Sequence, residues 1–413
     1  MTALVTVELV EHAPAVSHPL PDVLGRALAD SDIVAAAPDP YAAGHWQLKA
    51  GSKVGAVQVS APGVDHAVTI RVTPKVAIPR LFFLLGYSLD PGASWRAGEV
   101  DVAAHRELMP ALAHAVERQI DRALRQGLLQ GYRVAEETAL VVRGRNRHTD
   151  QMRRHFGATL PVEVAYDEFT ADIAENRILR AAVERLLSMP GVPHEVRRRL
   201  LHQRVRLADI SPLVRGHPLP EWRPTRLNAR CHQALHLSRA VLDGTSAEHL
   251  PGGLRIDGFL FDMNQLFEDF VTTALRETLR DTPLTARLQD PHHLDDDSRI
   301  RMRPDFVLYG SDGAPAAVAD AKYKAEKRGG FPDADLYQML AYCTALHLPE
   351  GHLIYAKGNA PHAAHRIRGS GIVIHQHALD LDQPPEHLLS DIARLSRALA
   401  GRRGDQPRLR IRE

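Results

Sequence analysis

Two acidic residues and a lysine in the last third of the 413-residue chain have the types and spacing of a metal-dependent hydrolytic site. The segments RPDFVLYG and APAAVADAKYK are typical of strands, and the turn signal GSDG at 310–313 lies between them. The Asp312-Gly313 pair favours a two-residue hairpin, since both positions tolerate positive φ. A hairpin centred there pairs residues whose numbers sum to 625, so Asp305 faces Asp320. Pro315 allows a wider loop, which would shift the register but keep the acids close.

Opposed carboxylates on paired strands repel each other, with Cβ atoms roughly 4.5 to 5.5 Å apart. A divalent cation between them, at about 2.0 to 2.1 Å from oxygen for Mg²⁺, makes the arrangement favourable. Strand alternation puts Lys322 and Lys324 on the face of Asp320, with Ala321 and Tyr323 on the other face. Lysine is rare here, with seven among 51 basic residues, and a compact ammonium is suited to polarising a water molecule. The alternative is an ordinary salt-bridged hairpin.

The elements around this hairpin predict a mixed sheet. From about residue 255, FLFDMNQLFEDFVTTALRETL is typical of a helix, and DADLYQMLAYCTAL, after the two strands, is typical of another. Strands are predicted at HLIYAKG and near GIVIHQHAL. This α-β-β-α-β order indicates a mixed sheet flanked by helices.

The earlier part of the chain predicts an α+β region and then a helical region. Strand-like pieces fill the first 75 residues, and a helix is predicted after Pro79. Between 101 and 128 apolar residues recur every four positions, which predicts a long amphipathic helix that Gly127 ends. The helix ENRILRAAVERLLSM ends at Pro190-Gly191. We therefore predict four parts: an N-terminal α+β domain at 1–155, a helical, Arg-rich connecting region at 156–250, the mixed-sheet domain at 251–400 and a charged tail at 401–413.

The segment 196–230 carries nine arginines against two acidic residues. Two interpretations are equally supported: a solvated helix face next to a Pro-rich linker, or a surface that contacts phosphates. On the second interpretation, Arg197, Arg198 and Arg199 would bind DNA without reading its sequence.

Composition limits the classes of protein that fit. Hydrophobic residues make up 44% of the chain and charged residues 24%, which is typical of globular domains, and the net charge of +1 excludes polyanion binding by bulk charge. The two cysteines, Cys231 and Cys343, exclude a disulfide framework or a Cys-ligated cluster and favour a reducing cytosol. The apolar run at 81–89 is about half the length that crosses a bilayer. We therefore expect a cytoplasmic protein with no membrane partner.

The hairpin residues resemble a known nuclease motif. Pro304-Asp305, fourteen intervening residues and then Asp320-Ala321-Lys322 resemble the PD-(D/E)xK motif. Gln338 and Tyr342, which share a helical face, resemble the QxxxY helix of the RecB-like branch. Glu268, on the preceding helix, stands where such nucleases often carry another acidic residue.

A longer resemblance is to the McrC family, the nuclease subunits of McrBC methylation-dependent restriction systems. Its matching segments span about 270 residues in the family's order. They are RVTPKV at 71–76, VVRGR at 141–145, YDEFTADIAENRIL at 166–179, FDMNQLFEDFV at 261–271, RPDFVL at 303–308, ADAKYK at 319–324 and DLYQMLAY at 335–342.

This resemblance implies a restriction-endonuclease-like fold for the mixed-sheet domain and a role for each site residue. Asp305, Asp320 and Lys322 would be catalytic, supported by Glu268, Gln338 and Tyr342. The two aspartates and the carbonyl of Ala321 would bind Mg²⁺, for which Mn²⁺ could substitute.

The resemblance also implies partners. They are double-stranded, methylated DNA and an McrB-like AAA+ GTPase ring whose hydrolysis the N-terminal region stimulates. The chain has no GxxxxGK[ST] phosphate loop of its own, which agrees with a separate motor.

Two other functions fit parts of this pattern. One is a stand-alone RecB-like exonuclease or repair nuclease, which the long N-terminal extension disfavours. The other is a non-catalytic activator of an AAA+ ring, which the intact Asp305, Asp320 and Lys322 disfavour.

Overall fold

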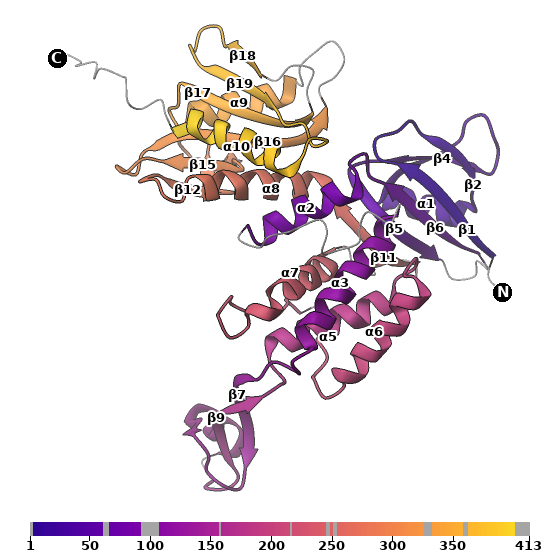
Figure 1. Ribbon diagram of the computed structural model, residues 1–413, viewed down its shortest axis with the longest axis vertical. Coiled ribbons are helices and arrows are strands. Elements are labelled where there is room, and N and C mark those ends of the chain that lie inside the picture. The colour runs from indigo at the N-terminus through magenta and orange to yellow at the C-terminus, as the bar shows by residue number, and fades with distance from the viewer. Residues whose placement is uncertain are drawn as a thin grey trace. The chain divides into compact units, whose positions relative to one another are not determined.

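The computed structural model divides the chain into two compact units. It describes residues 3–60, 66–91, 107–156, 158–214, 217–244, 248–250, 254–325, 333–357 and 362–400 (Figure 1). Unit 1 contains Met1–Glu107, Pro251–Leu254 and Leu260–Glu413, and unit 2 contains Leu108–Leu250 and Arg255–Phe259. The N-terminal strands and the mixed sheet thus share a unit, while the functional division at 155 and 250 stays a prediction. No helix in the described ranges is long and apolar enough to cross a membrane.

The N-terminal part of unit 1 has two small sheets, as predicted for an α+β region. In the first, β1, β6 and β5 lie side by side and β11 follows β5; the second has the order β2-β4-β3. Strand β1 runs parallel to β6, and β5 antiparallel to it. The elements are β1 (Ala3–Val10), β2 (Val16–Pro19), α1 (Asp22–Asp30), β3 (Val34–Pro38), β4 (His45–Ala50), β5 (Lys53–Ser60), β6 (His66–Thr73) and α2 (Ile78–Leu89), and β11 (Leu254–Asp262) has residues in both units.

The C-terminal part of unit 1 contains the predicted mixed sheet. Its order is β12-β15-β16-β17-β19-β18, with β16, β17 and β19 parallel and the other pairs antiparallel. Helix α9 is the crossover between parallel β16 and β17, and α8 and α10 also pack beside the sheet (Figure 1). The elements are α8 (Met263–Thr278), β12 (Thr285–Leu288), β13 (His292–His293), β14 (Arg301–Met302), β15 (Phe306–Tyr309), β16 (Pro315–Ala325), α9 (Asp333–Ala345), β17 (Glu350–Lys357), β18 (His362–Arg366), β19 (Val373–Ala378) and α10 (Pro385–Ala400).

The two faces of β16 contact different helices. Val318 belongs to a buried apolar cluster with Tyr342 of α9. On the opposite face, the Tyr323 ring lies 6.0 Å from the Phe267 ring of α8. Because side chains alternate along a strand, Asp320 and Lys322 share the face of Val318. The side chain of Lys324 and all of Lys327 lie outside the described residues.

The hairpin between β15 and β16 has the predicted register but a different turn. Phe306 pairs with Ala319 and Val307 with Val318, so the paired numbers sum to 625 as expected. The predicted two-residue turn is wrong: the loop has three residues, and only its last, Gly313, has positive φ (+74°). The physical reason is the Asp312 side chain, which accepts the Ala314 N–H (N···O 3.1 Å) and favours the longer loop. A register shift next to Tyr309 absorbs the extra residue.

The helix predicted to begin at FLFD begins later. Those residues end strand β11, and Asp262 is the N-cap of α8. Its carboxylate accepts the Asn264 N–H (N···O 2.9 Å), which satisfies a donor that a helix start leaves free. The short apolar run before Asp262 fits a buried strand as well as a helix, so periodicity alone does not separate them.

The far face of β16 is joined to the N-terminal strands through a buried carboxylate. Glu11 is fully buried, and one of its oxygens, Oε2, accepts both the Tyr323 hydroxyl (3.2 Å) and the Lys75 N–H (3.0 Å). Burial raises the pKa of Glu11 above its ordinary value, opposed by those two hydrogen bonds. Tyr323 is the direct neighbour of Lys322, so the strand that carries the hairpin acids is fixed on both faces.

Unit 2 contains a helical bundle and a small sheet. Helices α3, α5, α6 and α7 pack against one another. Helix α3 matches the periodicity predicted across 101–128, of which 101–106 lie outside the described residues, and Gly127 follows it with φ +86°. The elements are α3 (Leu108–Leu124), β7 (Gly131–Ala139), β8 (Arg145–Asn146), α4 (His148–His155), β9 (Val162–Thr170), α5 (Ala174–Ser188), α6 (His194–Arg206), α7 (His232–Asp243) and β10 (Glu248–Leu250).

The small sheet, in the order β7-β9-β8, exposes apolar side chains. Tyr132 and Phe169 pair across β7 and β9, with ring centroids 5.1 Å apart, although 76% and 60% of their surfaces are exposed. Val134 on β7 and Phe156 after α4 are exposed as well. We call Tyr132, Val134, Phe156 and Phe169 the apolar surface of this sheet.

Candidate active site

The structure brings Asp305 and Asp320 together at the hairpin. Asp305 directly precedes β15 and Asp320 lies in β16, one step beyond the Phe306–Ala319 pair. Both are buried, with 7% and 2% of their surfaces exposed. The Ala321 N–H donates to Asp305 Oδ2 (N···O 2.9 Å). Two buried carboxylates thus meet where the sequence predicts them.

Lys322 provides the positive charge beside these acids. Its ammonium forms an ion pair with Asp320 Oδ2. Burial alone would lower the pKa of Lys322, but the charge and hydrogen bond of Asp320 and the charge of Asp305 outweigh it, so the pKa is raised. Lys322 is therefore a charged donor at neutral pH, not a base.

The acids carry more negative charge than this single ammonium balances. Burial, and then the neighbouring charges of Asp320 and Glu268, raise the pKa of Asp305 to about 8. Burial, and then Asp269 and Asp320, also raise the pKa of Glu268. Glu268, on α8, is therefore electrostatically part of the site, as the family resemblance implies.

Helix α9 brings Tyr342 and Gln338 toward the acids. Tyr342 is buried, and its hydroxyl donates to the carbonyl of Arg303 (3.5 Å), two residues before Asp305. Burial, and then the charges of Asp320 and Asp305, raise the pKa of Tyr342, while a hydrogen bond with Gln338 opposes the shift. Gln338 is exposed and meets the site through this phenol. Their predicted common helical face agrees with this contact.

Two further residues were missed by sequence reasoning. Gln289, after β12, donates from its amide nitrogen to Glu268 and to Asp305 Oδ1 (3.1 Å). Asp335, buried in the first turn of α9, accepts the hydroxyl of the fully buried Tyr355 (3.1 Å). Its charge also helps to raise the pKa of Lys322. In the sequence, Asp335 is explained by the favourable interaction of an acidic residue with the start of a helix. Gln289 has no distinguishing sequence feature beyond its place after a strand.

The donor set suits Mg²⁺, which takes oxygen ligands and commonly uses only one or two carboxylates together with waters. Asp305 and Asp320 provide two, and the excess negative charge favours a divalent cation. Among the described residues, no group of three or more His, Cys, Asp or Glu is arranged to hold a metal. The expected third protein ligand is the carbonyl of Ala321. That carbonyl stays a prediction.

The arginines expected to bind DNA have partners within unit 2. Arg197 donates to the carbonyls of Leu187 and Met189 (3.2 Å for Met189) at the end of α5. Arg199 pairs with Glu117 and Glu195, at 2.9 Å each. Arg198 is exposed. Capping and ion pairing therefore account for two of the three, and a DNA role for any of them stays a prediction.

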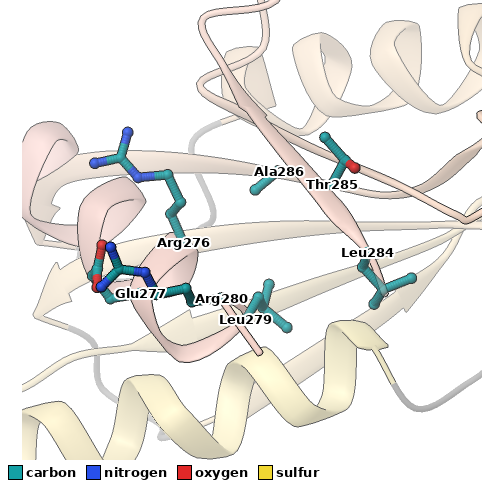
Figure 2. A pocket seen from close by; sticks show the side chains of 7 residues that line it. All are labelled: Arg276, Glu277, Leu279, Arg280, Leu284, Thr285 and Ala286. Atoms are coloured by element: carbon teal, nitrogen blue, oxygen red, sulfur yellow. The ribbon is translucent and has the colours of Figure 1, made fainter. Parts of the chain in front are cut away.

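A separate cavity of about 440 Å³ lies at the opposite end of β12 from Gln289. Figure 2 shows Arg276, from the last turn of α8, and Arg280, just beyond the helix, on one side of the cavity, with Thr285 and Ala286 of β12 on the other. Arg276 is eight residues beyond Glu268, which is about 12 Å along a helix. The cavity lining includes none of the acids described above.

Comparisons with known proteins agree on one restriction system. A family model described as McrBC 5-methylcytosine restriction system component matches residues 48–356. A solved structure described as a refined half-complex from a tetradecameric assembly of Thermococcus gammatolerans McrB AAA+ hexamers with bound McrC matches at 19% identity and a TM-score of 0.54, covering 94% of this chain and 98% of that chain. A cryo-EM structure of the Thermococcus gammatolerans McrBC complex matches at 19% identity and a TM-score of 0.37, covering 66% and 88%. No curated protein matches.

Proposed function

This chain belongs to the family of McrBC 5-methylcytosine restriction system components, and on that premise we propose that it is the DNA-cleaving subunit of such a system. In this proposal the C-terminal part of unit 1 is a PD-(D/E)xK nuclease domain that hydrolyses phosphodiester bonds. The observation that carries it is the buried pair of Asp305 and Asp320 with the Lys322 ammonium against them. Burying two carboxylates beside a single ammonium costs stability, and perturbed acids of this kind concentrate at functional sites.

Asp305, Asp320 and the carbonyl of Ala321 would hold Mg²⁺, with Mn²⁺ as a substitute. A bound Mg²⁺ polarises a phosphoryl oxygen and favours ionisation of a bound water. The Ala321 N–H holds Asp305 through Oδ2, so the backbone fixes the orientation of this carboxylate. The chain thus sets the position of one ligand before any cation arrives.

Lys322 would orient the attacking water and donate to the phosphate as negative charge develops. Its ammonium has three donors, and Asp320 occupies only part of that capacity. Since its pKa is raised, Lys322 keeps its proton and acts by hydrogen bonding and charge. Asp335 would support it from α9, and Tyr342 would hold the segment before Asp305 through the Arg303 carbonyl.

The proposed partner is an McrB-like AAA+ GTPase ring. One matching structure is described as McrB AAA+ hexamers with bound McrC, and this chain lacks a phosphate loop to drive translocation. We assign the contact to the region through residue 155, together with the paired strand β9. The apolar surface of the β7-β9-β8 sheet supports this assignment, because paired aromatic rings that remain exposed are typical of protein contact sites.

The test is cleavage of methylated double-stranded DNA by the full chain with its partner ring, GTP and Mg²⁺. Asp320→Asn and Lys322→Ala should each abolish cleavage while circular dichroism shows retained folding. Asp312→Asn is the matched control, because it makes the same substitution in the exposed turn of the same hairpin. Full cleavage by either site variant would refute the assignment. Cleavage without the ring would favour the stand-alone nuclease.

A further inference from the structure

Gln289 has a backbone conformation that L residues rarely adopt. Its φ is +51°, in the left-handed region. Both of its backbone polar groups are held there: its N–H donates to the Asp305 carbonyl (N···O 3.0 Å), and its carbonyl accepts from Arg303 Nε (3.1 Å). The disfavoured backbone is thus fixed to the segment that carries Asp305, and such strain commonly marks a functional position.

This conformation places the Gln289 amide between two acids. Nε2 donates to Glu268 Oε1 and to Asp305 Oδ1, the latter at 3.1 Å. A primary amide has two N–H donors, so one serves each carboxylate. In the structure the amide nitrogen is the end that faces the acids.

We propose that Gln289 holds Glu268 beside Asp305 in the cation-free protein and competes with a divalent cation for the Asp305 carboxylate. The inference rests on the proposed Mg²⁺ site. An amide carries only partial positive charge, so it balances the two acids less completely than a divalent ion does.

Gln289 opposes cation binding and does not prepare the site for it. Its N–H donates to Asp305 Oδ1, the oxygen that the Ala321 N–H does not use, and so competes with a cation for the negative charge of that oxygen. Asp305 does not depend on Gln289 for its position, because the Ala321 N–H holds Oδ2 at 2.9 Å. Removing the amide therefore removes a competitor without releasing the ligand.

The experiment is a calorimetric titration of the full chain with Mg²⁺ in the absence of DNA, together with melting temperatures in Mg²⁺ and in EDTA. Gln289→Ala should lower the Mg²⁺ dissociation constant about tenfold, which corresponds to ~1.4 kcal/mol. Its melting temperature in EDTA should fall below that of the wild type, because the two acids lose their shared donor. Gln289→Met, which keeps the length without the donors, should shift both quantities in the same directions.

Gln265→Ala is the matched control. Gln265, on α8, also donates from its amide to a carboxylate, Asp269 (2.9 Å), but it makes no contact with Asp305 or Glu268 among the described hydrogen bonds. Its Mg²⁺ affinity should equal that of the wild type. Unchanged or weaker Mg²⁺ binding by both Gln289 variants would overturn this inference and leave the proposed function standing. A wild-type chain that gives neither heat nor stabilisation with Mg²⁺ would overturn both.

Discussion

The carboxylate site of unit 1 and the β7-β9-β8 sheet of unit 2 depart from the usual distribution of side chains in opposite directions. In the first, acids that water would normally solvate are buried, as with Asp320 at 2% exposure. In the second, rings that a core would normally bury are in solvent, as with Tyr132 at 76% exposure. Each arrangement costs stability relative to its reverse.

The two regions differ in how much of this stability cost is offset by contacts within the region. The acids have local partners in Lys322, Gln289 and the Ala321 N–H, which balance part of their charge. Among the ring contacts of the described residues, the aromatic pair of the β7-β9-β8 sheet has only the contact between its own two rings. On the proposed function, a small ion would complete the first region, whereas the second would need a macromolecular surface.

The largest expected effect separates the two regions. Asp320→Ala should reduce DNA cleavage by at least about 1,000-fold, the scale of losing a central catalytic group. GTP turnover by the partner ring, measured with the variant at saturating concentration, should remain stimulated, because the substitution leaves the β7-β9-β8 sheet intact. Loss of stimulation in this variant would mean that the regions do not have separate roles.

The converse variant changes the apolar surface. Tyr132→Ser together with Phe169→Ser should reduce stimulation of GTP turnover about tenfold or more, as expected when interface aromatic residues are lost. The free energy of unfolding should fall by no more than about 1.5 kcal/mol, since both rings are exposed and lose mainly each other. Denaturant unfolding measures the second quantity. Arg394→Ala, an exposed change on α10, should leave stimulation unaltered.

These point variants replace a deletion of the N-terminal region. Such a deletion would remove Glu11 and Lys75 and leave Tyr323, beside Lys322, without its acceptor. It would therefore damage both regions at once and could not separate them.

The third prediction concerns Glu11, a buried acid outside the carboxylate site. The folded-state pKa of Glu11 is raised, so the native state binds more protons than the unfolded state above the ordinary carboxyl pKa. Stability contributed by Glu11 therefore falls as pH rises through that range. Glu11→Gln, which keeps an acceptor for Tyr323, should raise the free energy of unfolding by about 1 kcal/mol at pH 8 and change it little at pH 4. A gain that is equal at both pH values would contradict this account.

The smallest effects are expected in the arginine segment. Arg198→Gln should lower DNA affinity slightly and reduce the log-log salt slope by about 0.9, with unfolding free energy unchanged within about 0.5 kcal/mol. Arg197→Gln should instead destabilise the fold by about 1 kcal/mol, because it removes donors from the end of α5. Binding titrations across salt concentrations test the first. An unchanged slope would show Arg198 to be only a solvated residue.

Local patterns predicted much of this architecture, and long-range geometry explains what they missed. The turn and the alternation around it predicted that Phe306 pairs with Ala319 and that Asp305 meets Asp320, because register depends on nearby residues. The bridge made by Gln289 depends on one left-handed φ and on a helix 21 residues earlier in the chain, and no local pattern records either. The sequence does not distinguish an arginine that caps a carbonyl from one that contacts a phosphate, so it supported both interpretations of Arg197 equally.

The Glu11–Tyr323 hydrogen bond also bears on how the chain is made. Its partners are 312 residues apart, and at a synthesis rate of roughly 5 to 20 residues per second the phenol follows the carboxylate by about 16 to 60 s. For most of that interval the strands β1, β5 and β6 have been synthesised without the strand that carries Tyr323. A nascent chain that has not reached β16 also lacks Asp320 and Lys322, so the proposed site can form only after the N-terminal strands have waited for them.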